Sequence, residues 1–183
     1  MSESSPIKDA LYAEIDKIGQ EKINELLIKK EFSVIFENIF ESAIDKINED
    51  FSKDEKAGTL AESITHYLFT EMLVPSQRKI SYKNRELDLV IPNTLELKRN
   101  SENTIIVLFV KTNNMTEIIN KISEIKKIQQ KDDNIWVISE HSIDITQRSY
   151  LTNKTSFAEF LKDAENFIQT KNMNKLNIFK TKL

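Results

Sequence analysis

The hydrophobic period of the chain changes near Pro75, and this change constrains the fold more than any other feature of the sequence. Before Pro75, apolar residues recur every three or four positions, which is typical of helices, and the clearest stripe spans residues 32–47. After Pro75, short apolar runs have the character of strands, and helical spacing returns between them. The sequence therefore predicts an α/β protein in which helices flank a small mixed β-sheet.

The spacing of apolar residues and of capping residues places the individual elements. Helices are expected over residues 7–30 and 32–50, and three more are expected to begin at capping boxes. These boxes pair Thr59 with Glu62, Asn114 with Glu117, and Ser156 with Glu159. Strands are expected over residues 79–83, 86–91, 104–111 and 134–139, with an edge strand near Ile143 and Ile145 and a short strand near Leu176 and Ile178.

Connection lengths predict the sheet topology and the division of the chain. The first three strands are close enough in sequence to form an antiparallel meander, and the helix from Asn114 would make the next connection a parallel crossover. Residues 58–183 would then form the α/β core, and residues 1–57 a helical layer packed on it. This layer has too much apolar surface to stand alone, so it packs on the core or forms a homodimer with a second copy.

Composition restricts the compartment and the partners. The 183-residue chain has no cysteine, no apolar run long enough to span a bilayer, and no signal-peptide pattern at Met1, so a soluble cytoplasmic protein without a membrane partner is expected. Residues 1–57 carry 14 acids and 8 bases, and residues 58–183 carry 15 acids and 18 bases. The second part would attract a polyanion mildly, but no large basic patch for tight duplex binding is evident.

Two charged residues lie on strands that are otherwise apolar. Asp88 lies inside the expected strand of residues 86–91, and Lys111 ends the strand of residues 104–111. Such residues cost free energy unless they are paired or used. Because side chains alternate across a strand, one face should hold Glu86, Asp88 and Val90, and in the next strand one face should hold Ile105, Val107, Phe109 and Lys111. We expect Asp88 and Lys111 to point at one spot, a layout that holds a divalent cation beside a phosphate.

This arrangement resembles the PD-(D/E)xK nuclease superfamily, which has the restriction-endonuclease-like fold. The resemblance spans residues 59–139, with Asp88 in the second strand, Lys111 at the end of the third, and Glu62 on the preceding helix. It implies metal-dependent hydrolysis of nucleic-acid phosphodiesters, in which Asp88 is the main ligand of Mg²⁺ or Mn²⁺ and Glu62 a supporting ligand. Lys111 would position the attacking water or stabilise the developing negative charge.

One departure from the superfamily pattern leaves two functions open. Phe109 stands two residues before Lys111, where the superfamily has an acid. Either the acid has moved, with Glu62 or Glu117 in its place, or the domain is an inactive interaction module that binds nucleic acid weakly or joins an assembly.

A second alignment takes the required acid and lysine from a different segment. Residues 95–98 read Leu-Glu-Leu-Lys, which places Glu96 and Lys98 on one side of an extended segment. Residues 105–110 are more strand-like, which favours Lys111. Each candidate also has a purely structural interpretation: Glu62 can cap a helix, Asp88 can pair with Arg85 or Lys98, and Lys111 can be solvated.

Overall fold

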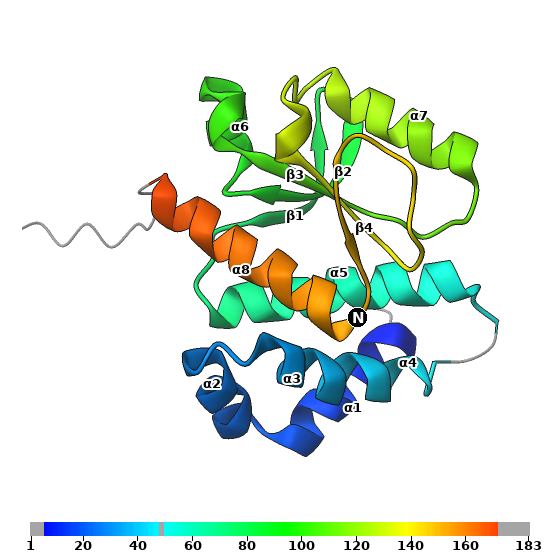
Figure 1. Ribbon diagram of the computed structural model, residues 1–183, viewed down its shortest axis with the longest axis vertical. Helices are drawn as coiled ribbons and strands as arrows, with labels where there is room; N and C mark the ends of the chain where they lie inside the picture. Colours follow the sequence, from blue (N-terminus) through cyan, green and yellow to red (C-terminus); the bar gives the residue numbers. More distant parts are fainter. Residues whose placement is uncertain (1–5, 48–49, 172–183) are drawn as a thin grey trace, which may run out of the picture.

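A five-stranded mixed sheet forms the centre of the computed structural model, which describes residues 6–47 and 50–171 (Figure 1). Its strand order follows the sequence from β1 to β5. The strands are β1 (Gln77–Tyr82), β2 (Arg85–Ile91), β3 (Ile105–Phe109), β4 (Ile135–Ser139) and β5 (Arg148–Leu151). The predicted α/β class and small mixed sheet flanked by helices are therefore confirmed.

Helices cover both faces of this sheet. On one face lie α5 and α8, with α1 to α4 forming a further layer beneath them, and on the other face lies α7 (Figure 1). The helices are α1 (Pro6–Ile18), α2 (Gln20–Ile28), α3 (Phe32–Phe36), the π-helical η1 (Glu37–Glu41), α4 (Ser42–Ile44), α5 (Lys53–Glu71), α6 (Thr94–Arg99), α7 (Met115–Lys126) and α8 (Lys154–Thr170), with short 3₁₀ turns η2 (Ser101–Asn103) and η3 (Asp132–Asn134). No helix among these residues combines the length and the apolar character needed to cross a bilayer.

The predicted topology is confirmed. Strands β1, β2 and β3 form an antiparallel meander, and α7 connects β3 to the parallel strand β4. Lys83 and Asn84 join β1 to β2 with φ values of 49° and 60°, the left-handed geometry of a two-residue hairpin turn that matches strand twist. The strand that follows β4 at its edge of the sheet is β5, parallel to β4. Ile143 and Ile145 are loop residues packed against the core, so their assignment to an edge strand was wrong. The strand expected at Leu176 and Ile178 lies outside the described residues.

Two of the predicted helix starts were wrong because a different residue provides the cap. Ser52 caps α5, its Oγ accepting a hydrogen bond from the Glu55 N–H at 3.2 Å, so Thr59 lies inside the helix and the 57/58 boundary falls within α5. In the same way Asn153 caps α8 in place of Ser156. Asn114 does cap α7, accepting from the N–H groups of Thr116 and Glu117. The caps show that Glu62 has no capping role.

The N-terminal layer shares one hydrophobic core with α5, α8 and the sheet. The helix expected over residues 7–30 is divided at Gly19, whose φ of 85° lies in the left-handed region that glycine adopts readily. The stripe of residues 32–47 is buried within the chain, and the ring of Phe36 lies 4.4 Å from that of Phe40 and 4.7 Å from that of Phe157 on α8. This stripe is therefore not available as a homodimer surface.

Candidate functional site

Strands β2 and β3 separate at Asp88, and this split positions the candidate site. β2 is paired with β1 from Arg85 to Val90 except at Asp88, but with β3 only from Leu89 to Ile91. At the split, the Asp88 Oδ2 accepts a hydrogen bond from the backbone N–H of Phe109 at 2.9 Å. The carboxylate thus takes the place of a backbone acceptor in the ladder, because the β2 backbone has already turned away.

The strand alternation changes at the same position. Lys79, opposite Asp88 on β1, has a φ of 50°, and neither residue has a partner in the β1–β2 register. As a result Leu87 and Val90 both pack against the α7 side of the sheet, whereas Leu89 and Ile91 pack against the α5 side. The expectation that regular alternation continues through Asp88 was therefore wrong. In β3 it holds: Ile105, Val107 and Phe109 face α5, and Lys111 reaches toward that helix.

A buried carboxylate and two cations, here called the Glu62 cluster, lie on the α5 side. Glu62 is 1% exposed; Arg78 Nε donates to its Oε1 and Lys111 Nζ to its Oε2, both at 2.6 Å. Burial raises the pKa of Glu62, but the hydrogen bonds and charges of Lys111 and Arg78 outweigh it and leave the pKa below its ordinary value. Glu62 is therefore ionised at neutral pH, with both oxygens bound to cations of its own chain.

Gly58 allows α5 to approach the end of β3 closely enough to form this cluster. A Cβ at position 58 would lie 2.1 Å from the Val110 carbonyl oxygen and 2.9 Å from the Lys111 Cγ. Gly58 is one helical turn before Glu62, so the same close approach places Glu62 against Lys111. Sequence reasoning missed this role and that of Arg78; the available signal was a glycine in a chain that has only two.

Asp88 lies within electrostatic reach of the cluster but outside its hydrogen bonds. Burial raises the pKa of Asp88, and the nearby charge of Glu62 adds to this effect. The charge of Lys111, the Phe109 N–H and the charge of Lys121 lower the pKa without offsetting burial, so it stays above its ordinary value. Asp88, Lys111 and Glu62 are thus brought into one region, as expected, but the Lys111 ammonium hydrogen bonds to Glu62 and not to Asp88.

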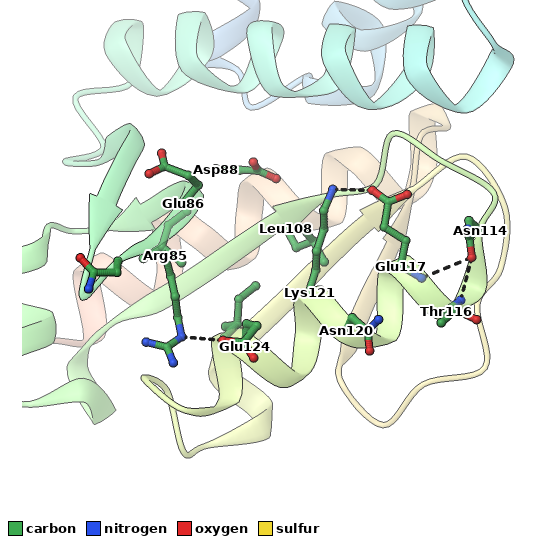
Figure 2. A pocket seen from close by; sticks show the side chains of 13 residues that line it. Arg85, Glu86, Asp88, Leu108, Asn114, Thr116, Glu117, Asn120, Lys121 and Glu124 are labelled. Carbon is green, nitrogen blue, oxygen red and sulfur yellow. Dashed lines mark hydrogen bonds and ion pairs between the residues drawn. The ribbon is translucent and has the colours of Figure 1, made fainter.

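On its other side Asp88 borders the β2–α7 cleft, a space of about 670 Å³ between the start of β2 and helix α7 (Figure 2). Two ion pairs cross or line the cleft: Lys121 with Glu117 at 3.0 Å and Arg85 with Glu124 at 2.9 Å. The residues that line the cleft are Asn84, Arg85, Glu86, Leu87, Asp88, Leu108, Asn114, Thr116, Glu117, Asn120, Lys121, Glu124 and Ile125. Glu86 and Asp88 form no ion pair with any described residue, so the cleft contains two carboxylates without a cationic partner.

The donors present do not fit the expected Mg²⁺ or Mn²⁺ ion, which needs several oxygen ligands. Both oxygens of Glu62 are bound to cations, and one oxygen of Asp88 is bound to a backbone N–H. Phe109 is buried in the α5-side core, and Glu117 is paired with Lys121. Within residues 6–47 and 50–171, no group of three His, Cys, Asp or Glu side chains has the geometry to hold a metal.

The alternative pair Glu96 and Lys98 does not lie on an extended segment. Both residues belong to the short helix α6, capped by Asn93, so positions two residues apart point in different directions. The Glu96 carboxylate accepts from the Asn103 amide at 3.0 Å and lies 3.9 Å from Arg99. The prediction that Glu96 and Lys98 lie on one side of an extended segment was therefore wrong. Lys98 is exposed on this helix.

No family model matches the chain, and no curated protein or solved structure matches it either. Geometry and charge therefore indicate the function, and two regions differ in both. In the Glu62 cluster, the buried carboxylate is paired with Arg78 and Lys111. The β2–α7 cleft is open and is lined by Glu86 and Asp88, which form no ion pair with any described residue.

Proposed function

We propose that the protein is a restriction-endonuclease-like domain that serves as a binding module and does not cleave nucleic acid. The observation that carries this proposal is the state of Glu62, whose two carboxylate oxygens are each hydrogen bonded to a cation at 2.6 Å. The position expected to supply a further acid holds Phe109, which is 1% exposed.

The chemistry of phosphodiester hydrolysis explains why this arrangement favours binding over catalysis. A metal-dependent nuclease uses carboxylates to hold the cation, and the cation lowers the pKa of the attacking water. Here Lys111 and Arg78 neutralise Glu62, and the Lys111 ammonium, which would stabilise the developing charge, is already hydrogen bonded. Freeing Glu62 for a metal would leave two partly buried cations without their anion, which is costly. The cluster instead ties α5 to β1 and to the end of β3.

The direct test is a cleavage assay. The purified protein is incubated with Mg²⁺ or Mn²⁺ and with branched, single-stranded and duplex DNA and with RNA, alongside Asp88→Ala. We expect no cleavage and no difference between the two proteins. The result that would overturn the proposal is metal-dependent cleavage that disappears in Asp88→Ala but persists in Glu102→Gln, an exposed acid outside the site.

A thermal-shift titration with the same cations provides an independent measurement. Because Asp88 offers one remaining oxygen and Glu62 none, Mg²⁺ and Mn²⁺ should leave the melting temperature unchanged. A stabilisation that grows with metal concentration and is absent in Asp88→Asn would instead show that a metal site exists.

A further inference from the structure

The β2 strand has an unpaired inner edge where it borders the β2–α7 cleft. Residues 85–87 pair with β1 on one side, but β3 has no residue in register with them on the other side. Asn84, Arg85, Glu86 and Leu87 all line the cleft there. Since successive residues of a strand direct their N–H and C=O groups to alternate sides, part of this backbone faces the cleft. Unpaired strand groups of this kind are a template for another extended chain.

The two outer edges of the sheet are poorer templates. The outer edge of β1 is interrupted by Lys79, whose left-handed φ of 50° disturbs the extended backbone, and β5 has only 4 residues. Irregular and short strands at an edge prevent pairing with another chain. The unpaired edge of β2, residues 85–87, is also short, but its backbone has no positive φ, and it faces α7 across a cleft that can hold a peptide (Figure 2).

The charges of the cleft indicate which chain would fit. Its cations, Arg85 and Lys121, are paired with Glu124 and Glu117. Glu86 and Asp88 form no ion pair with any described residue, although the charges of Lys111 and Lys121 act on Asp88 at longer range, so a cationic side chain is the complementary group. Apolar side chains also line the cleft, namely Leu87, Leu108 and Ile125. A polyanion would meet two unpaired carboxylates and be repelled.

We propose that the β2–α7 cleft binds an extended peptide segment of a partner protein, which adds a strand along residues 85–87 and places a lysine or arginine against Asp88 and Glu86. This inference rests on the proposed function and names the partner class of that binding module. Backbone pairing would supply affinity, and the basic side chain would supply specificity. The cleft volume of about 670 Å³ lies in the range of ligand-binding sites.

The experiment uses a display library of randomised heptapeptides selected on the full chain. We expect enrichment of lysine or arginine at one position and of apolar residues at the adjacent positions, because Leu87 faces the opposite side of β2 from its neighbour Glu86. A selected peptide, measured by fluorescence anisotropy, should lose about tenfold or more in affinity with the double variant Glu86→Gln, Asp88→Asn. The matched control Glu102→Gln, an exposed acid outside the cleft, should bind as the unaltered protein does.

Two further measurements test strand addition itself. Methylating alternate backbone nitrogens of the peptide should abolish binding, and the amides of residues 85–87 should gain hydrogen-exchange protection on binding. Asn120→Trp, an exposed α7 position that lines the cleft, should fill the space and weaken binding about tenfold without unfolding the protein. Binding unaffected by this variant would place the peptide elsewhere and overturn the inference.

The remaining outcomes separate this inference from the proposed function. A library without enrichment for basic residues, or a selected peptide indifferent to Glu86 and Asp88, overturns the peptide site alone. Single-stranded DNA that binds the cleft and is displaced by no peptide would show a nucleic-acid partner and also overturn it. Metal-dependent cleavage in the assay described above would instead overturn the proposed function.

Discussion

Glu62 and Asp88 are neighbouring carboxylates in opposite environments. Glu62 is buried on α5 and hydrogen bonded to Arg78 and Lys111, and its pKa lies below the ordinary value. Asp88 is half-buried at the β2–β3 split and, within the part of the chain that the structure describes, is hydrogen bonded to one backbone N–H and to no cation. Its pKa lies above the ordinary value because of burial. Both carboxylate oxygens of Glu62 are hydrogen bonded within the fold, whereas Asp88 keeps one carboxylate oxygen that can bind a ligand.

Lys111 produces this difference. Its ammonium is near both acids but hydrogen bonds to Glu62, whose deeper burial makes an uncompensated charge more costly. Asp88 is affected only at longer range by the charges of Lys111 and Lys121. The Glu62 cluster should therefore govern stability, and Asp88 should govern binding in the β2–α7 cleft. Substitutions can test this separation.

The largest effect is expected from Glu62→Gln, which removes the anion of the cluster and leaves Arg78 and Lys111 unpaired. The free energy of unfolding at pH 7, measured by chemical denaturation, should fall by about 3 kcal/mol. Because the pKa of Glu62 is lowered on folding, its contribution is present above the ordinary pKa of 4.5. It is lost as the pH falls through the lowered value, so the two proteins should converge in acid.

Glu124→Gln is the matched control, since it removes an acid that pairs with Arg85 at the surface. An exposed pair contributes little, so this variant should unfold almost as the unaltered protein does. Equal losses for Glu62→Gln and Glu124→Gln would mean that the cluster is no better satisfied than a surface pair, and the contrast between Glu62 and Asp88 would fail.

A smaller loss is expected from Gly58→Ala. Alanine favours a helix more than glycine does, yet its Cβ would overlap the Val110 carbonyl oxygen, so the variant should be less stable by about 2 kcal/mol. A double-mutant cycle with Glu62→Gln adds a sharper test. Because Gly58 brings α5 against Lys111, the two losses should not add. Additive losses would show that the close approach and the ion pairs are independent.

The sheet could be predicted from the sequence because its signals are local. Periodicity located β1 to β4 but not β5, and the short connections of the meander implied the antiparallel pairing that brings Asp88 near Lys111. The start of α5 also has a local signal, since Ser52 and Glu55 have capping-box spacing. Gly58 is unusual in a helix interior, and only its tertiary contact with Val110 explains its presence.

The charge balance of the site could not be predicted in the same way. The contact of Arg78 with Glu62 depends on the packing of α5 against β1, which no local pattern encodes. The split at Asp88 lies opposite Lys79, which has a positive φ, and no local pattern marks this break in the alternation assumed for β2. The order and pairing of the strands predicted that Asp88 would lie near Lys111, but hydrogen bonding across three elements determined which acid Lys111 neutralises.

The smallest effect is expected from Asp88→Asn, and it has the opposite sign. The amide oxygen of asparagine can still accept from the Phe109 N–H, while the cost of a half-buried charge disappears, so the variant should be slightly more stable at pH 7. Because the pKa of Asp88 is raised on folding, its charge costs stability above the raised value and costs nothing below the ordinary value of 3.8. The gain should therefore vanish as the pH falls through this interval, as measured by denaturation at several pH values. If Asp88→Asn lost stability at pH 7 as Glu62→Gln does, Asp88 would belong to the satisfied cluster, and no acid would be free for a ligand at the split.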